Sequence, residues 1–149
     1  MKSERIEKSK VVIDTNTIIS APLSEDGNPA MIFELLLLGE INNFRSEEIT
    51  NEVIEVFHRE KIKKLVSREK TQFIIGNYKK FSELVKPNIE LSVVKEDDDD
   101  NRILECAETA NVDYVISGDE HLLNLKNHKN IKIVSLKNFY GSIKPQRNE

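Results

Sequence analysis

The sequence contains one cysteine, Cys106, and no tryptophan among its 149 residues. A single cysteine excludes an internal disulfide framework and a zinc site built from several cysteines. The three histidines are scattered, so a zinc site built from paired histidines is disfavoured as well. No apolar run approaches the roughly 20 residues of a membrane span. The charged N-terminus lacks the apolar segment of a secretory signal. These absences predict a cytoplasmic protein with no membrane partner.

Positive charge is also in short supply. The chain has 22 Lys and Arg against 26 Asp and Glu, which gives a net charge of −4. This balance disfavours non-specific coating of nucleic acid, which needs a basic surface. It does not exclude an enzyme that reaches phosphate through metal ions. The length and the 38% hydrophobic content predict a single domain over residues 1–149, with a core at about 10–140.

Short apolar runs alternate with helical patterns along the chain. The helical patterns include one starting at Asn28 and Pro29, one capped by Ser46, and a last turn at 136–140. Residues 20–28 and 97–101 are expected to form loops. Strands are predicted at residues 10–14, 41–45, 89–94, 114–117 and 131–134, and further helices within 61–85 and up to about residue 111. The alternation predicts a three-layer α/β/α sandwich around a central, mostly parallel sheet.

Acidic residues fall where three of these strands are expected to end. Asp14 closes the first strand in VVIDTN, the run 97–100 follows the strand at 89–94, and Asp119 follows the strand at 114–117. The carboxyl ends of parallel strands lie at one edge of a sheet, so these acids are expected to converge there. Glu52 lies beside the apolar stripe of the helix that Ser46 caps, and is expected to join them.

Carboxylates gathered in one cleft repel one another unless a cation compensates their charge. Oxygen ligands suit hard cations, so the residue types point to Mg²⁺ or Mn²⁺. Taken one by one, the acids also have plainer interpretations. Asp14 could end a strand at a turn, Glu52 could be solvated, and Asp119 could cap a short helix. The acids at 97–100 could favour a helix N-terminus electrostatically, and which of 97–99 contributes besides Asp100 stays open.

Four motifs in this order, VVIDTN, SEEITNEVIEVF, DDDDNRILECA and YVISGDEHLL, resemble the PIN domain. Within that family the chain is most similar to the VapC-type toxins of toxin–antitoxin systems, over about residues 11–140. The resemblance implies a metal-dependent endoribonuclease that cleaves RNA with Mg²⁺ or Mn²⁺. It implies a small antitoxin and a second copy of the chain as partners. The catalytic and metal-binding residues that it implies are Asp14, Glu52, Asp100 and Asp119, supported by Asn16, Asp97 and Ser117.

The chain departs from this branch in two places. The usual D-P-D-D-N motif lacks its proline here, and Glu120 with His121 replaces the Lys-Asp pair that often follows SGD. The main alternative is a catalytically silent PIN-like module that binds RNA or protein, which the intact acids disfavour. A haloacid-dehalogenase-type phosphatase would need a second Asp where Asn16 stands, and a receiver domain would need a lysine after a late strand. The basic stretch 58–64 could hold RNA phosphates or form a solvated helical face.

Overall fold

The first strand of the sheet is buried on both faces. The computed structural model describes residues 8–23, 28–95 and 97–147. In β1 (Ser9–Ile13), Val11 and Ile13 belong to one hydrophobic core and Val12 to another. Successive side chains of a strand point to opposite faces, so a continuous apolar run needs cover on both sides. The strand predicted at residues 10–14 is present as β1.

Six strands form one sheet in the order β3-β2-β1-β4-β6-β5. All neighbouring pairs are parallel except β5 and β6. The strands predicted at 41–45, 114–117 and 131–134 are present with nearly the expected bounds. The remaining strands are β2 (Ile41–Arg45), β3 (Ser82–Leu84), β4 (Tyr114–Ile116), β5 (Asn127–His128) and β6 (Ile131–Val134).

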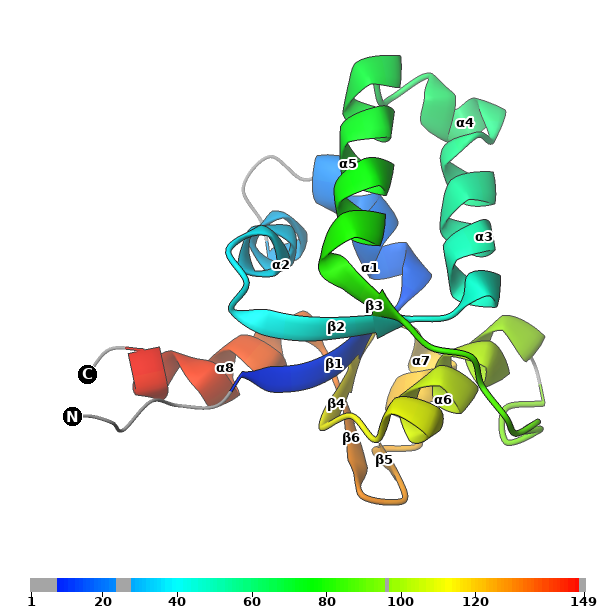
Figure 1. Ribbon diagram of the computed structural model, residues 1–149, viewed down its shortest axis with the longest axis vertical. Coiled ribbons are helices and arrows are strands. Elements are labelled where there is room, and N and C mark those ends of the chain that lie inside the picture. The colour runs from blue at the N-terminus through cyan, green and yellow to red at the C-terminus, as the bar shows by residue number, and fades with distance from the viewer. Residues whose placement is uncertain (1–7, 24–27, 96, 148–149) are drawn as a thin grey trace.

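Helices cover both faces of this sheet, as Figure 1 shows. One core lies between the sheet and α1, α2, α3, α5 and α8, and the other lies under α6 and α7. The predicted three-layer α/β/α sandwich is therefore confirmed. The helices are α1 (Thr15–Ser20), the 3-10 helix η1 (Ala21–Leu23), α2 (Asn28–Leu37), α3 (Glu47–Phe57), α4 (Glu60–Lys63), α5 (Arg68–Phe81), α6 (Asp98–Ala110), α7 (Glu120–Leu123) and α8 (Leu136–Arg147).

Local capping chemistry sets several helix ends. The Ser46 hydroxyl accepts a hydrogen bond from the Ile49 N–H at the start of α3, as predicted. Gly39, after α2, has φ of +73°, and Asn111 ends α6 in the left-handed region with φ of 56°. Glycine and asparagine adopt this conformation at low cost, which favours an end for both helices here, and α6 ends near residue 111 as predicted.

The strand predicted at 89–94 is wrong. That segment has irregular backbone, and the edge strand is instead β3. Side chains of α6 form hydrogen bonds with the backbone of this segment. Glu105 accepts from the Leu91 N–H at 2.8 Å, and Asn101 bonds both the N–H and the carbonyl of Val94. The prediction of an acidic loop at 97–101 is also wrong, because α6 begins at Asp98.

Two other expectations need correction. The loop predicted at 20–28 contains the 3-10 helix η1, and its residues 24–27 lie outside the described residues. The predicted turn at 136–140 is the beginning of the longer helix α8. Within the described ranges, no helix combines the length and the apolar character needed to cross a membrane.

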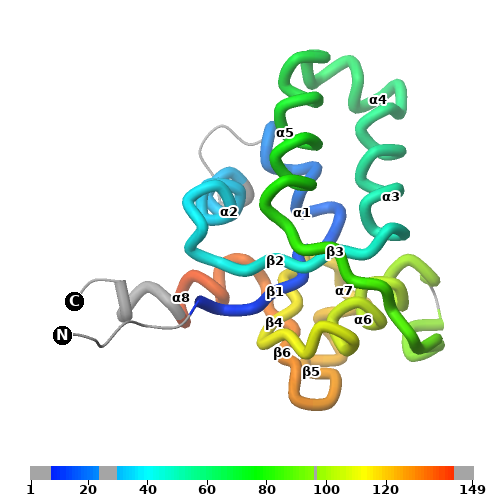
Figure 2. Tube along the Cα trace, in the orientation of Figure 1, coloured from blue at the N-terminus to red at the C-terminus, as the bar shows by residue number. Residues whose placement is uncertain are grey.

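The strand order changes direction between the paired strands β1 and β4, and we call the region beyond their carboxyl ends the crevice. The chain moves outward from β1 to β2 and β3, and then returns through α6 to β4 on the other side of β1 (Figures 1 and 2). The two strand ends are tied together, because the Asp14 N–H donates to the Ile116 carbonyl at 2.9 Å. In open α/β sheets ligands bind at such a switch point, at the carboxyl ends of the strands.

Candidate metal centre

Asp14 lies at the end of β1, immediately before α1, and is only 5% exposed. The Ser117 hydroxyl, from the end of β4, donates to Asp14 Oδ2 at 2.8 Å and accepts from the Asp119 N–H at 2.9 Å. Burial raises the pKa of Asp14; the Ser117 hydrogen bond opposes this rise and the charge of Asp119 adds to it. Ser117 therefore links the two acids that follow neighbouring strands.

Two further acids are the N-caps of helices. Asp119 caps α7 by accepting from the His121 N–H at 2.6 Å, and Asp97 caps α6 by accepting from the Asp99 N–H at 2.9 Å. A carboxylate has two oxygens and several lone pairs, so capping is compatible with binding a cation. The caps fix the orientation of both carboxylates before any ligand arrives.

Asp100 completes a cluster of three carboxylates. Asp97, Asp100 and Asp119 each offer an oxygen, and these oxygens all lie within 4.8 Å of one another. Asp100 is 4% exposed, and its buried Oδ2 has no hydrogen-bond partner among the described residues. Burial, followed by the charges of Asp119 and Asp97, raises the pKa of Asp100 to about 7. A buried oxygen without a partner, among like charges, fits the all-oxygen environment that Mg²⁺ and Mn²⁺ prefer.

Glu52 faces the same crevice from α3. The Thr15 hydroxyl donates to Glu52 Oε1 at 3.0 Å, which fixes the carboxylate beside the first strand end. Burial, with the charge of Asp99 next, raises the pKa of Glu52 to about 7, and the charge of Asp14 contributes to the rise. Asp99 and Glu52 thus form a second acidic pair beside the three-carboxylate cluster.

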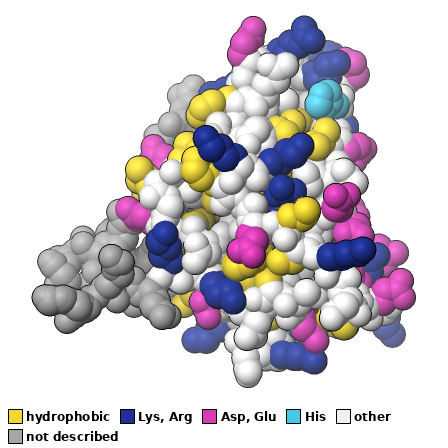
Figure 3. Space-filling view, in the orientation of Figure 1, with side chains coloured by type: hydrophobic (Ala, Val, Ile, Leu, Met, Phe, Trp, Pro, Cys, Tyr) yellow, Lys and Arg dark blue, Asp and Glu magenta, His cyan; other side chains and the backbone are white. Residues whose placement is uncertain are grey.

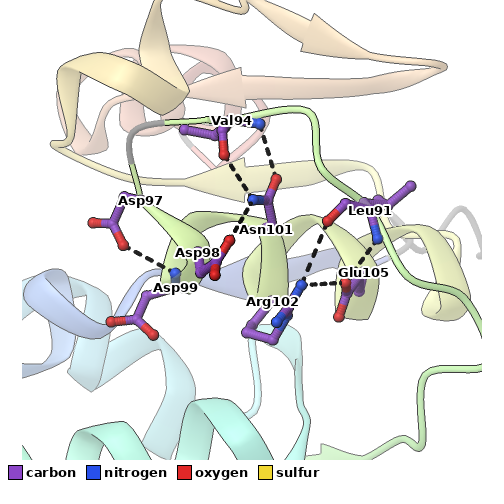
Figure 4. Close-up of polar contacts among 8 residues, drawn as sticks. All are labelled: Leu91, Val94, Asp97, Asp98, Asp99, Asn101, Arg102 and Glu105. Carbon is purple, nitrogen blue, oxygen red and sulfur yellow. Dashed lines mark hydrogen bonds and ion pairs between the residues drawn. The ribbon is translucent and has the colours of Figure 1, made fainter.

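The loop before the cluster is held by α6, as Figure 4 shows. Asn101 is buried, accepts from the Val94 N–H at 2.9 Å and donates to the Val94 carbonyl at 2.7 Å. One turn further along the helix, Glu105 accepts from the Leu91 N–H and from Arg102 at 2.6 Å. These contacts replace the hydrogen bonds of a strand and set where the chain enters Asp97.

Replacing Asn101 with alanine is expected to destabilise the protein by about 2–3 kcal/mol, because two buried backbone groups of Val94 lose their partners. Urea unfolding followed by circular dichroism measures this change. Asn51→Ala is the matched control, since Asn51 is exposed on α3, and we expect a change within about 0.5 kcal/mol. Equal stabilities for the two variants would show that the contacts with Val94 do not hold the loop.

A polar groove adjoins the cluster on the side of α8. It has a volume of about 470 Å³, and its lining includes Asp119, Ser117 and Gly118 as well as Lys137. An added Cβ at Gly118 would meet nothing within 4 Å, so the groove is open at this point. The groove gives a ligand access to the Asp119 side of the cluster.

The structure brings most of the predicted site residues to one place. Asn16 differs from the others, because its side chain is exposed and its contribution to Asp14 is a backbone N–H that lowers the pKa of that acid. Asn16 also lines the polar groove. The predicted residues that share the crevice are Asp14, Glu52, Asp97, Asp100, Ser117 and Asp119.

Sequence reasoning missed three residues of the site. Thr15 follows Asp14 directly, and a hydroxyl beside an expected acid could have indicated a hydrogen-bond donor to a site carboxylate. Asn101 is a polar residue one turn before Glu105 on a largely buried helix, and that spacing could have marked a contact with the preceding loop. Whether Asp99 contributes besides Asp100 was left open, and the action of its charge on Glu52 was missed.

Comparisons with known proteins agree with this architecture. The family model described as PIN domain matches residues 10–121. The uncharacterized protein MJ1680 of Methanocaldococcus jannaschii is 33% identical over 134 residues, which cover 89% of this chain and 84% of that protein. A chain in the crystal structure of VapBC2 from Rickettsia felis, bound to a DNA fragment from their promoter, superposes with a TM-score of 0.57 at 12% identity. That match covers 85% of this chain and 98% of the other, and it shows a shared fold. The chain belongs to the PIN domain family.

Proposed function

We propose that this protein is a metal-dependent endoribonuclease that hydrolyses RNA phosphodiester bonds with Mg²⁺ or Mn²⁺. One observation carries the proposal above the others. Asp97, Asp100 and Asp119 offer oxygens within 4.8 Å of one another at the switch point of the sheet, and one buried oxygen of Asp100 has no partner among the described residues. Asp14 and Glu52 face the same crevice, and membership of the PIN domain family supports a nuclease.

Each acid has a role that its contacts suit. Asp97, Asp100 and Asp119 would hold the cation directly. Asp14 is oriented by Ser117 and Glu52 by Thr15, and both carboxylates would add negative charge beside the cation. When bound, a divalent ion lowers the pKa of a bound water and neutralises charge that develops on the phosphate oxygens. Attack by water needs no protein nucleophile, and it would leave a 5′-phosphate and a 3′-hydroxyl.

Removal of divalent ions tests the proposal. We expect wild-type protein to cleave members of a labelled RNA panel with Mg²⁺ or Mn²⁺, and EDTA to abolish cleavage until metal is returned. Asp14→Asn is expected to lower the rate by about 10²-fold or more, because it removes a charge from the crevice while keeping the shape of the side chain. Cleavage that survives EDTA would overturn the mechanism. A wild-type protein that cleaves no RNA would favour the catalytically silent binding module.

The proposed cellular setting is a cytoplasmic toxin–antitoxin pair. The likeness to a chain of a VapBC2 complex supports a small antitoxin partner, and a homodimer is proposed from the resemblance to that toxin branch. A short reading frame directly upstream that encodes a DNA-binding protein would support this setting. Co-expression of the two products should yield a complex by size-exclusion chromatography, and the antitoxin should inhibit cleavage.

A further inference from the structure

Two segments of this acidic chain are basic, residues 58–80 and residues 126–147, and the first forms helices beside α3. Residues 58–80 contain eight Lys and Arg and two Glu, a net charge of +6, which leaves −10 for the rest of the chain. These residues form α4, α5 and the start of their connection to α3, an arm that projects from the sheet (Figure 1). In Figure 3, Lys and Arg side chains lie over α4 and α5, and Asp and Glu gather at the edge beside α3 and α6.

A groove of about 640 Å³ runs between the helices of this arm. Three cationic side chains, Lys63, Arg68 and Lys79, line it together with His58, and none of its lining residues is acidic. All three cations are exposed, and none of them pairs with a carboxylate in the described part of the chain. The groove is therefore a concave surface of uncompensated positive charge, which attracts anions.

The floor of the groove indicates the kind of anion. Its apolar residues include Phe57, which is 1% exposed, and Val66, which is 5% exposed. The remaining apolar lining can contact the base or sugar of a ligand, and the unpaired cations at the rim select for an anionic one. Gly76 lies in the middle of α5, and an added Cβ there would meet nothing within 4 Å. The helix backbone is thus open to close approach by a ligand.

The groove and the acidic crevice share the helix α3. Glu52 faces the crevice, and His58, six residues later, lines the groove. At 1.5 Å per helical residue this separation is about 9 Å along the axis. A strand with one phosphate in the crevice can therefore place neighbouring phosphates at the groove. The charge of the arm would offset the repulsion that the acids exert on the same strand.

We propose that the groove between α3 and α5 is a binding site for the phosphate backbone of single-stranded RNA, with Lys63, Arg68 and Lys79 as its phosphate contacts. The choice of RNA rests on the proposed function; the preference for a polyanion rests on the charge and shape of the groove. The contacts are to phosphate, so binding is expected to depend strongly on salt and weakly on sequence.

Fluorescence anisotropy with a labelled single-stranded RNA tests this proposal, in EDTA so that no cleavage occurs. The triple variant Lys63→Ala, Arg68→Ala, Lys79→Ala is expected to bind at least tenfold more weakly than wild type. Its slope of log affinity against log salt should fall by about 2, since each lost phosphate contact removes about 0.7 for a single strand. Gly76→Leu, which fills the groove and leaves every charge, should also weaken binding, whereas Gly76→Ala should weaken it less.

The control removes the same charge from the same arm outside the groove. Lys61→Ala, Lys64→Ala, Lys70→Ala is expected to weaken binding less than threefold, because these exposed lysines do not line the groove. Equal losses in both triple variants, or no RNA binding by wild type, would overturn the proposal. Displacement of RNA by an acidic peptide that binds more tightly would instead assign the groove to a protein partner. Normal binding in EDTA with no cleavage in Mg²⁺ would reject the nuclease and keep the groove.

Discussion

The variant Asp100→Asn is expected to lower the rate of RNA cleavage by at least about 10³-fold. Asparagine keeps the shape of the side chain but removes the charge and replaces one carboxylate oxygen with an NH₂ group. The affected group is 4% exposed, and its Oδ2 is the buried oxygen that no described residue contacts. A cation held at this point supplies several kcal/mol of charge stabilisation in the transition state, and about 4 kcal/mol corresponds to a factor of 10³. Single-turnover cleavage of a labelled RNA at saturating enzyme measures the loss.

Asp98→Asn is the matched control for this experiment. Asp98 begins the same helix, is exposed, and is not among the three acids of the cluster. The control therefore makes the same Asp-to-Asn change two residues before Asp100. We expect its cleavage rate to lie within about threefold of the wild-type rate. An Asp100→Asn enzyme with wild-type activity would remove Asp100 from the mechanism. An equally inactive Asp98→Asn enzyme would point to damage to the helix N-terminus rather than to loss of a ligand.

The acids at the ends of β1 and β4 were predictable from sequence for a physical reason. Asp14 and Asp119 follow short runs rich in Val and Ile, and such runs form buried parallel strands. Parallel strands place their carboxyl ends at one edge of the sheet. The two acids are therefore brought together although 105 positions separate them in the sequence. Local pattern and topology agree here, and the prediction needed no knowledge of side-chain packing.

Asp100 was predicted by a route that the structure contradicts. It was expected to follow a strand at 89–94, but it reaches the crevice from the first turn of α6. The segment 89–94 has an apolar, β-branched composition typical of a strand. Its backbone hydrogen bonds go to Asn101 and Glu105 instead, and such long-range competition is not visible in a local window.

The pairing of Asp99 with Glu52 was not predictable, because it depends on how α6 packs beside α3. Consecutive helical residues point about 100° apart, so Asp99 and Asp100 face different neighbours. After burial, the charges that raise the pKa of Asp100 most are those of Asp119 and Asp97, whereas the charge that raises the pKa of Glu52 most is that of Asp99. Helix α1 was missed for a related reason. Its sequence TNTIIS has weak helix propensity, and burial of Ile18 and Ile19 in the core compensates for it.

The metal-free protein is expected to lose stability as pH rises from about 4 to 8. Burial and neighbouring charge raise the pKa of both Asp100 and Glu52 to about 7 in the folded state. The folded state then holds more protons than the unfolded state between these limits, so the free energy of unfolding falls as pH rises through the folded pKa. For Asp100, a shift from 3.8 to about 7 corresponds to a change on the order of 4 kcal/mol. Thermal unfolding in EDTA across this pH range measures the slope.

Divalent metal and Asp100→Asn should each reduce this loss of stability, with opposite consequences for activity. At pH 8, Mg²⁺ or Mn²⁺ at 100 times its dissociation constant is expected to stabilise the wild type by about 2.7 kcal/mol, because only the folded state gathers the carboxylates. Asp100→Asn, which removes one buried charge, should be more stable than wild type in EDTA at pH 8 and gain little from metal. Asp98→Asn should retain the wild-type pH slope and metal response. A flat wild-type profile, or an Asp100→Asn protein that metal stabilises fully, would show that the acids are kept together for a reason other than cation binding. The charged carboxylates destabilise the metal-free protein because their positions suit a bound cation and not the fold without one.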